Sequence, residues 1–257
     1  RLGVGYVPTT SKNFEKGYAE VSGRMQELHK DGRTTTLEFG AGAAKHQPLD
    51  RYRKWLNEDD VMRVRGKDDR AWLPAMDPDF RKFVERICSD FGWPKGPVNG
   101  VMLWNEPWEG ISISGWGADM IRYRNIFTAM ARGVEDAEKE AGVEVYIGGC
   151  DSSSNTFDKL FGDGSDKFLK WLDFMSIHYQ GRSPHTNVRM FNERKDAKGK
   201  PAPVQVWDTE SWMANSDDRI AGTLAAMYSF GQQRVVGINS NSMVNTGTRV
   251  RLHGVKG

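Results

Sequence analysis

Short apolar runs alternate with longer amphipathic segments along most of this chain of 257 residues. The runs Leu2–Val7 and Thr34–Phe39 have the length and composition of buried strands, and Phe14–His29 between them carries apolar residues at helical spacing. A parallel pair of strands needs a long crossover connection, which a helix supplies, so alternating strands and helices favour a parallel sheet. The sequence therefore predicts an α/β fold.

The same alternation continues toward the carboxyl end of the chain. We expect further helices near 77–88, 118–141, 156–171 and 217–232, and weaker helical segments near 49–56 and 188–195. The expected strands that follow are Val98–Trp104, Val143–Gly149, Phe174–His178, Val204–Thr209 and Val235–Asn239. The length of the chain matches the roughly 250 residues typical of a (β/α)8 TIM barrel, so we predict one barrel domain spanning 1–257.

Seven expected strands leave an eight-stranded barrel one short. Either Val61–Arg65 or Thr248–Val255 would supply the eighth strand, and the remaining alternative is that the chain lacks an N-terminal βα unit. The long stretch from Gly40 to Met76 follows a strand, which puts it on the face where the strands end. Loops of that length in compact domains are usually functional or mobile.

Composition excludes several classes of protein. The 36 Lys and Arg against 34 Asp and Glu give a formal net charge of +2, too little to favour nucleic acid or an anionic membrane as a partner. No apolar stretch approaches the roughly 20 residues that a membrane span needs. The chain shows no signal segment but begins at Arg1 rather than Met, which indicates a mature or trimmed fragment, and we expect an extracellular or periplasmic protein.

Metal and cofactor sites are not expected. The five histidines lack the paired spacing of metal ligands, and Cys88 and Cys150 form neither a disulfide framework nor a zinc pattern, so we interpret both as buried thiols. Gly40-Ala41-Gly42 lacks the third glycine and the helix start of a phosphate-binding loop. The sequence does not show which oligomeric state the protein adopts.

Two glutamates follow strands of the predicted sheet. Glu106 comes after the apolar run Val98–Leu103, and Glu210 comes after the β-prone run Pro203–Thr209. Their numbers differ by 104, which is three steps of about 35 residues, in keeping with the 30 or more of a βαβ unit. The carboxyl ends of parallel strands meet at one face, where barrel enzymes carry their active sites, so we expect both glutamates there.

Such a pair suits the cleavage of a glycosidic bond with retention of configuration. That reaction needs one protonated carboxylic acid and one carboxylate about 5–5.5 Å apart. Glu106, beside the apolar Trp104, is the expected acid, and Glu210 the expected carboxylate. Trp108 and Trp212 lie just past the strand ends, where flat apolar rings would contact the C–H faces of sugars.

The string Trp104-Asn105-Glu106-Pro107 resembles the Asn-Glu-Pro signature that ends the fourth barrel strand in clan A of the retaining glycoside hydrolases. Glu210 is similar in position to the second catalytic glutamate of that clan, which ends the seventh strand. The order of the expected strands matches that of the clan over about 34–241. Within the clan, the chain most resembles the broad groups around families 5 and 39.

The resemblance implies roles for individual residues. Glu106 would be the general acid/base, Glu210 the nucleophile and Asn105 the donor to the sugar 2-hydroxyl. His178 and Tyr179 match the position from which the clan orients the nucleophile and lines the subsite. The implied partner is a carbohydrate, as an oligo- or polysaccharide, and neither the sugar, the linkage nor endo or exo action follows from the sequence.

Alternatives stay open at this point. Trp207 either contacts substrate or packs in the barrel core. Glu38 either contacts substrate or forms an ion pair. His178 either lines the substrate site or is a core histidine whose hydrogen bonds are made within the protein. The whole chain is alternatively a non-catalytic carbohydrate-binding barrel, or a transglycosylase that uses the same site.

Overall fold

The structure of this chain is a computed structural model. It describes residues 1–12, 14–41, 71–72, 74–107, 115–116, 120–152, 169–178, 193, 195, 199–201, 203–213, 234–235 and 238–240. At 41, 120, 150–152, 169, 177, 208, 210–213, 234–235 and 238–240 it describes the backbone alone.

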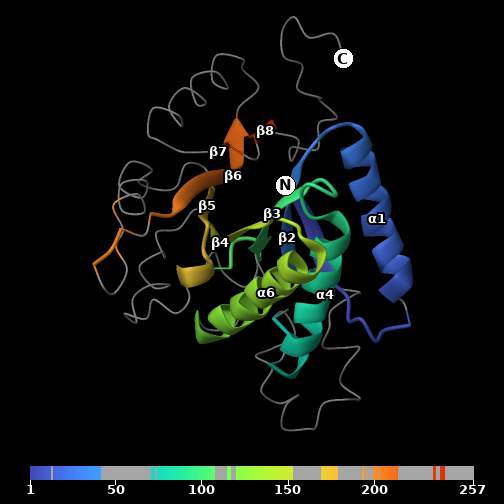
Figure 1. The fold of residues 1–257 in the computed structure, drawn as a ribbon. Coiled ribbons are helices and arrows are strands. Elements are labelled where there is room, and N and C mark those ends of the chain that lie inside the picture. Colours follow the sequence, from blue (N-terminus) through green and yellow to red (C-terminus); the bar gives the residue numbers. More distant parts are fainter. Residues whose placement is uncertain are drawn as a thin grey trace, which may run out of the picture.

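The strands form one parallel sheet that follows the order of the chain (Figure 1). Its strands are β1 (Leu2–Tyr6), β2 (Thr35–Ala41), β3 (Val98–Leu103), β4 (Tyr146–Ser152), β5 (Phe174–His178), β6 (Gln205–Met213), β7 (Arg234–Val235) and β8 (Ile238–Ser240). Both β7 and β8 pair with β6, Trp207 with Arg234 and Ser211 with Ile238, so they continue one register and occupy one strand position. The parallel α/β sheet is confirmed, and its described strands occupy seven positions.

In the described part of the chain, three helices lie between the first four strands. They are α1 (Phe14–Lys30), α4 (Asp77–Phe91) and α6 (Met120–Ala141), and two short 3-10 turns are η3 (Pro74–Met76) and η4 (Leu169–Trp171). Figure 1 shows α4 and α6 side by side against the strands, with α1 beyond α4. The helices expected near 14–29, 77–88 and 118–141 are confirmed. The helices expected near 49–56 and 217–232 and the candidate strands 61–65 and 248–255 fall outside the described residues, as do 156–168 of the expected helix 156–171, whose described end is the 3-10 turn η4. Of the weak helix expected near 188–195, only 193 and 195 are described, and Lys195 forms an isolated bridge with Pro201 there.

The end of α6 and the loop after it explain why β4 begins later than expected. Gly142 ends α6 with a positive φ of 64°, a conformation that glycine adopts without strain. After it, the backbone N–H of Glu144 donates to the carbonyl of Trp93, and that of Val145 donates to the Glu138 side chain. Because these donors are taken outside the sheet, β4 begins at Tyr146 rather than at the expected Val143.

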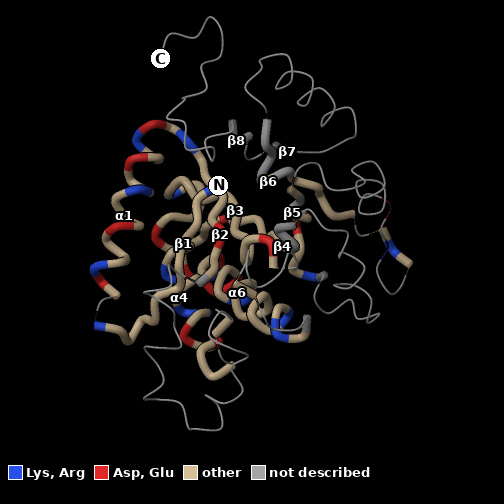
Figure 2. Tube along the Cα trace, turned by 180° about the vertical axis from the view of Figure 1, so that it is seen from behind, with Lys and Arg blue, Asp and Glu red and all other residues tan. Residues whose placement is uncertain are grey.

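The core lies between the outer face of the sheet and the helices. Alternate strand residues such as Val4, Leu37, Phe39, Val101 and Leu103 are at most 5% exposed and belong to one cluster with apolar residues of all three helices. Cys88 of α4 is fully buried there, as expected, and burial raises the pKa of its thiol. Lys and Arg alternate with Glu along α1, which is typical of a helix with one face in solvent (Figure 2).

The other face of the sheet is concave. Nη1 of Arg1, the residue before β1, lies 2.9 Å from Nε2 of His178 at the end of β5. In a flat sheet these strands would be four spacings, or about 19 Å, apart, which exceeds the combined reach of the two side chains. The sheet therefore curls, as a barrel wall does. No described pairing joins β1 to β7, so closure into an eight-stranded barrel stays a prediction.

A small apolar layer fills part of the concave face. Phe174 stacks on Trp207 with ring centroids 3.7 Å apart, and Met102 completes this second cluster. Gly148 of β4 faces the same rings, and a Cβ there would lie 2.1 Å from Phe174. Glycine is thus required at 148 by close packing.

None of the described helices combines the length and hydropathy that crossing a membrane requires.

Candidate functional site

Side chains that follow β3, end β5, lie within β2 and precede β1 meet on the concave face. Arg1 lies 2.9 Å from Glu38 of β2 in an ion pair, and its Nη2 donates to Oδ1 of Asn105, just past β3, at 3.1 Å. Nδ1 of His178, at the end of β5, lies 2.8 Å from Oε1 of Glu106. The His178 side chain is fully buried and that of Glu106 is 14% exposed, so the cluster is largely enclosed but Glu106 remains open to solvent.

The backbone is strained where β3 ends. Trp104 has φ of 61° and Glu106 has φ of 47°, and both therefore occupy the left-handed region that bulky residues rarely adopt. Each such residue costs on the order of 1–3 kcal/mol, and strain of this kind clusters at active and ligand-binding sites. The two strained residues flank Asn105, so the strain falls on the segment that carries the polar cluster.

Aromatic packing holds this strained turn in place. The Trp104 ring lies 4.9 Å from that of Trp116 and 5.7 Å from that of Trp72, and the backbone N–H of Trp104 donates to the carbonyl of Phe39. The hydroxyl of Tyr123 on α6 donates to the carbonyl of Leu103. Helix α6 and the neighbouring strand thus fix the position from which Asn105 and Glu106 project.

Four of the residues expected at the site come together. Asn105, Glu106, His178 and Glu38 form one network, with Arg1 at its centre. Glu38 lies inside β2 rather than at its end and is paired with Arg1, which favours the ion-pair alternative. His178 contacts Glu106 in this structure, whereas the resemblance implied a contact with the nucleophile.

Glu210 lies beside this network in its backbone position. His178 pairs with Glu210 across β5 and β6, and the register shifts there because the preceding pair joins Ile177 to Asp208. The shift marks a bulge or a similar irregularity of this strand pair, and bulges are common next to active sites. The side chain of Glu210 lies outside what the structure describes, so its separation from Glu106 stays a prediction.

The expected tryptophan contacts divide into two groups. Trp207 is 1% exposed, stacks on Phe174 and donates its indole N–H to Gln205, which favours the core alternative over a substrate contact. Trp207 lies two residues before Thr209 within β6, and thus below the polar cluster. Trp108 and Tyr179 lie outside the described residues, as does the side chain of Trp212.

Arg1 belongs to this cluster although no sequence motif singles it out. Its side chain is 18% exposed and touches three of the four residues above. A lone arginine before a strand carries no motif, so only the curl of the sheet reveals it. The inward positions of β1 after it, Gly3 and Gly5, have no side chains, which is the one signal in the sequence that space is left along this strand.

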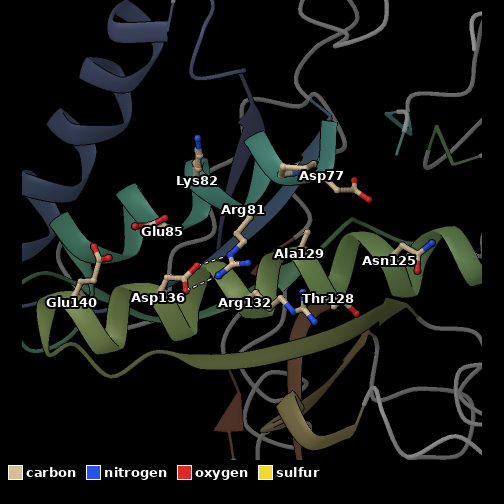
Figure 3. Close-up of a pocket in the computed structure, with 11 residues that line it drawn as sticks. Asp77, Arg81, Lys82, Glu85, Asn125, Thr128, Ala129, Arg132, Asp136 and Glu140 are labelled. Atoms are coloured by element: carbon tan, nitrogen blue, oxygen red, sulfur yellow. Dashed lines mark hydrogen bonds and ion pairs between the residues drawn. The ribbon is translucent and has the colours of Figure 1, made fainter. Parts of the chain in front are cut away.

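A surface groove of ≈ 560 Å³ lies elsewhere, between α4 and α6 on the outer face (Figure 3). Arg81 donates to both carboxylate oxygens of Asp136 across it, at 2.5 and 2.8 Å. Burial, together with the nearby Glu140 and Asp136 carboxylates, raises the pKa of Glu85 in its wall. The groove is a helix–helix surface of mixed charge, distinct from the cluster at the strand ends.

Among the described residues, no three His, Cys, Asp or Glu side chains are grouped so that they could hold a metal ion.

Comparisons with known proteins give little beyond this geometry. No family model matches the chain, and no curated protein matches it. Among solved structures it is similar to the crystal structure of a glucosidase from Croceicoccus marinus, with 18% sequence identity and a TM-score of 0.47. The match covers 64% of this chain and 38% of the glucosidase, so the chain spans well under half the length of that protein. A likeness at this level assigns neither fold nor activity.

Proposed function

We propose that this chain is the catalytic barrel of a retaining glycoside hydrolase, secreted to act on an oligo- or polysaccharide. The observation that supports the proposal most is the position of Glu106. This carboxyl projects from a strained turn at a strand end and forms a hydrogen bond with the buried His178. Its side chain remains 14% exposed. Glu210, the register partner of His178, is the second carboxyl of the proposed pair.

The proposed reaction has two displacements. Glu106 gives its proton to the glycosidic oxygen as that oxygen leaves, and a carboxylate oxygen of Glu210 forms a bond to the anomeric carbon with inversion. Glu106, now a carboxylate, then takes a proton from water, whose oxygen attacks the anomeric carbon and releases Glu210 with a second inversion. The net result is hydrolysis with retained configuration and a regenerated pair of side chains.

The remaining candidate residues have supporting roles in this proposal. Asn105 would donate to the 2-hydroxyl, and Trp108, Trp212 and Tyr179 would line the sugar subsites. Hydrogen bonds to the 2-hydroxyl strengthen in the transition state, which makes Asn105 the residue whose loss should lower the catalytic rate along with binding.

Two neutral variants test the proposal against a matched control. On a panel of aryl glycosides, Glu106→Gln and Glu210→Gln should each lose about 10²–10⁴-fold or more in rate, because general acid and nucleophilic catalysis are removed. Glu20→Gln, an exposed glutamate of α1, should retain full rate. Azide should restore activity to Glu210→Gln and give a product of inverted configuration.

Other outcomes of the same assay identify the alternatives. If both Gln variants hydrolyse substrate like the parent, Glu106 and Glu210 are not the catalytic pair. A parent that binds glycans in calorimetry without turning over any substrate is a carbohydrate-binding barrel. Products longer than the substrate, formed with an added acceptor sugar, indicate transglycosylation.

A further inference from the structure

Arg1 constrains where the proton of His178 can be. Its Nη1 lies 2.9 Å from Nε2 of the imidazole, whose Nδ1 lies 2.8 Å from Oε1 of Glu106. A guanidinium group has five N–H donors, has no acceptor and stays protonated in proteins. At this distance Nε2 of His178 has to accept the hydrogen bond, so it carries no proton. The ring proton is then on Nδ1, which donates to Glu106.

The same argument applies to Asn105. Nη2 of Arg1 donates to Oδ1 of this side chain at 3.1 Å, which fixes the orientation of the amide. The amide N–H groups of Asn105 are thus turned away from Arg1. The Arg1 guanidinium therefore fixes which atoms of two neighbouring side chains accept and which donate. His178 and Asn105 both accept from Arg1 and turn their N–H groups away from it.

We propose that Arg1 is a positioning residue, which fixes His178 as the neutral Nδ1–H tautomer and thereby makes Oε1 of Glu106 a hydrogen-bond acceptor. The proton that Glu106 transfers then sits on its other oxygen, Oε2. The assignment of that proton rests on the proposed function, whereas the tautomer of His178 does not.

Burial and ion pairing make the arrangement specific. Glu38 lies 2.9 Å from Arg1 and balances its charge, and the two side chains are 11% and 18% exposed. His178 is fully buried. An imidazolium in this place would direct Nε2–H at the guanidinium, with two cations at contact distance in an enclosed site, where charges interact strongly. The neutral ring is therefore the state that this network accepts.

Nitrogen NMR of histidine-labelled protein reads the tautomer without reference to activity. The labelled parent is compared with His178→Gln, which identifies the His178 signals among those of the five histidines. We expect a protonated-type shift for Nδ1 and an unprotonated-type shift for Nε2 at neutral pH. An Nε2–H ring or an imidazolium in the parent overturns the proposal.

Two variants of Arg1 test its part in fixing the tautomer. Arg1→Lys keeps a donor-only cation and should keep the Nδ1–H pattern. Arg1→Met combined with Glu38→Gln removes the donor without leaving an unpaired buried carboxylate, and should shift the ring toward Nε2–H. An unchanged pattern in the double variant contradicts the role of Arg1. If the double variant does not fold, the parent spectrum still decides the tautomer.

Activity separates this inference from the proposed function. Arg1→Lys should hydrolyse substrate at least about tenfold faster than Arg1→Met/Glu38→Gln. An Nδ1–H ring in a parent whose Glu106→Gln variant remains fully active contradicts the hydrolase proposal alone. An Nε2–H ring in a parent that needs Glu106 contradicts the inference about Arg1 alone.

Discussion

The two faces of the sheet are built from different chemistry. The convex face presents side chains such as Leu37, Phe39 and Val101, which pack against the helices in one apolar cluster. The concave face changes character along β5. On β5 the inward residues run from Phe174 through Ser176 to His178, all of them fully buried, so the strand passes from apolar to ionisable while burial stays constant.

The apolar layers of the sheet stabilise the fold, and the polar layer carries the candidate site. Burial of apolar surface stabilises the convex face and the lower layer of the concave face, whereas the upper layer keeps charged and polar groups enclosed by pairing them. The hydroxyls of Ser176 and Thr209, 2.6 Å apart, lie between these layers. Substitutions in the lower layer should therefore act on folding, and substitutions at Glu106 mainly on activity.

The largest expected effect on stability is at Trp207. Trp207→Ala removes a fully enclosed ring that stacks on Phe174, and should lower the free energy of unfolding by about 3–5 kcal/mol because a cavity remains. Ile121→Ala on α6, where the side chain is 66% exposed, should change it by less than about 0.5 kcal/mol. Urea unfolding of both variants gives the comparison, and equal losses would mean that the lower layer is not packed as described.

A methyl group at Gly148 tests the same layer in the opposite sense. Gly148→Ala should lower the free energy of unfolding by about 1–3 kcal/mol, because the new Cβ overlaps the Phe174 ring. Gly23→Ala in α1 meets no atom within 4 Å and should raise stability by about 0.5–1 kcal/mol through helix propensity. Thermal unfolding distinguishes the signs, and a stabilised Gly148→Ala would contradict the close approach of Phe174.

The smallest effect is expected on the outer surface. Two hydrogen bonds from Arg81 hold the pKa of Asp136 below its usual value. A lowered pKa in the folded state stabilises the protein above the unfolded pKa of about 3.9, and this contribution disappears as the pH falls through the folded pKa. Asp136→Asn should therefore cost about 0.2–1 kcal/mol at pH 7 and progressively less in acid. Unfolding curves across this pH range measure it, and a cost that grows in acid would have the wrong sign.

Much of the framework follows from periodicity. Strand Phe174–His178 has the bounds that its sequence predicts, and the helix stops at Gly92 and Gly142 act locally, so local patterns identify them. The start of β4 differs because the loop at Trp93, distant in sequence, takes up a backbone donor.

The site was only partly predictable. Asn105 and Glu106 lie in a motif, and His178 ends a clear strand, so each could be found from sequence. Arg1 joins them only because the sheet curls and brings β1 opposite β5, a long-range effect that no local pattern encodes. The sequence around Trp207 looks the same whether the ring packs inside the sheet or contacts a ligand. Its stacking on Phe174, which only the structure shows, favours packing inside the sheet.

The separation of the Glu106 and Glu210 carboxyl groups tests the central claim most directly. In a crystal structure of the chain with a sugar bound, we predict about 5–5.5 Å between them, with the anomeric carbon between the two groups, as retention requires. A separation beyond about 8 Å, or side chains directed into different regions, would contradict a retaining mechanism at this site.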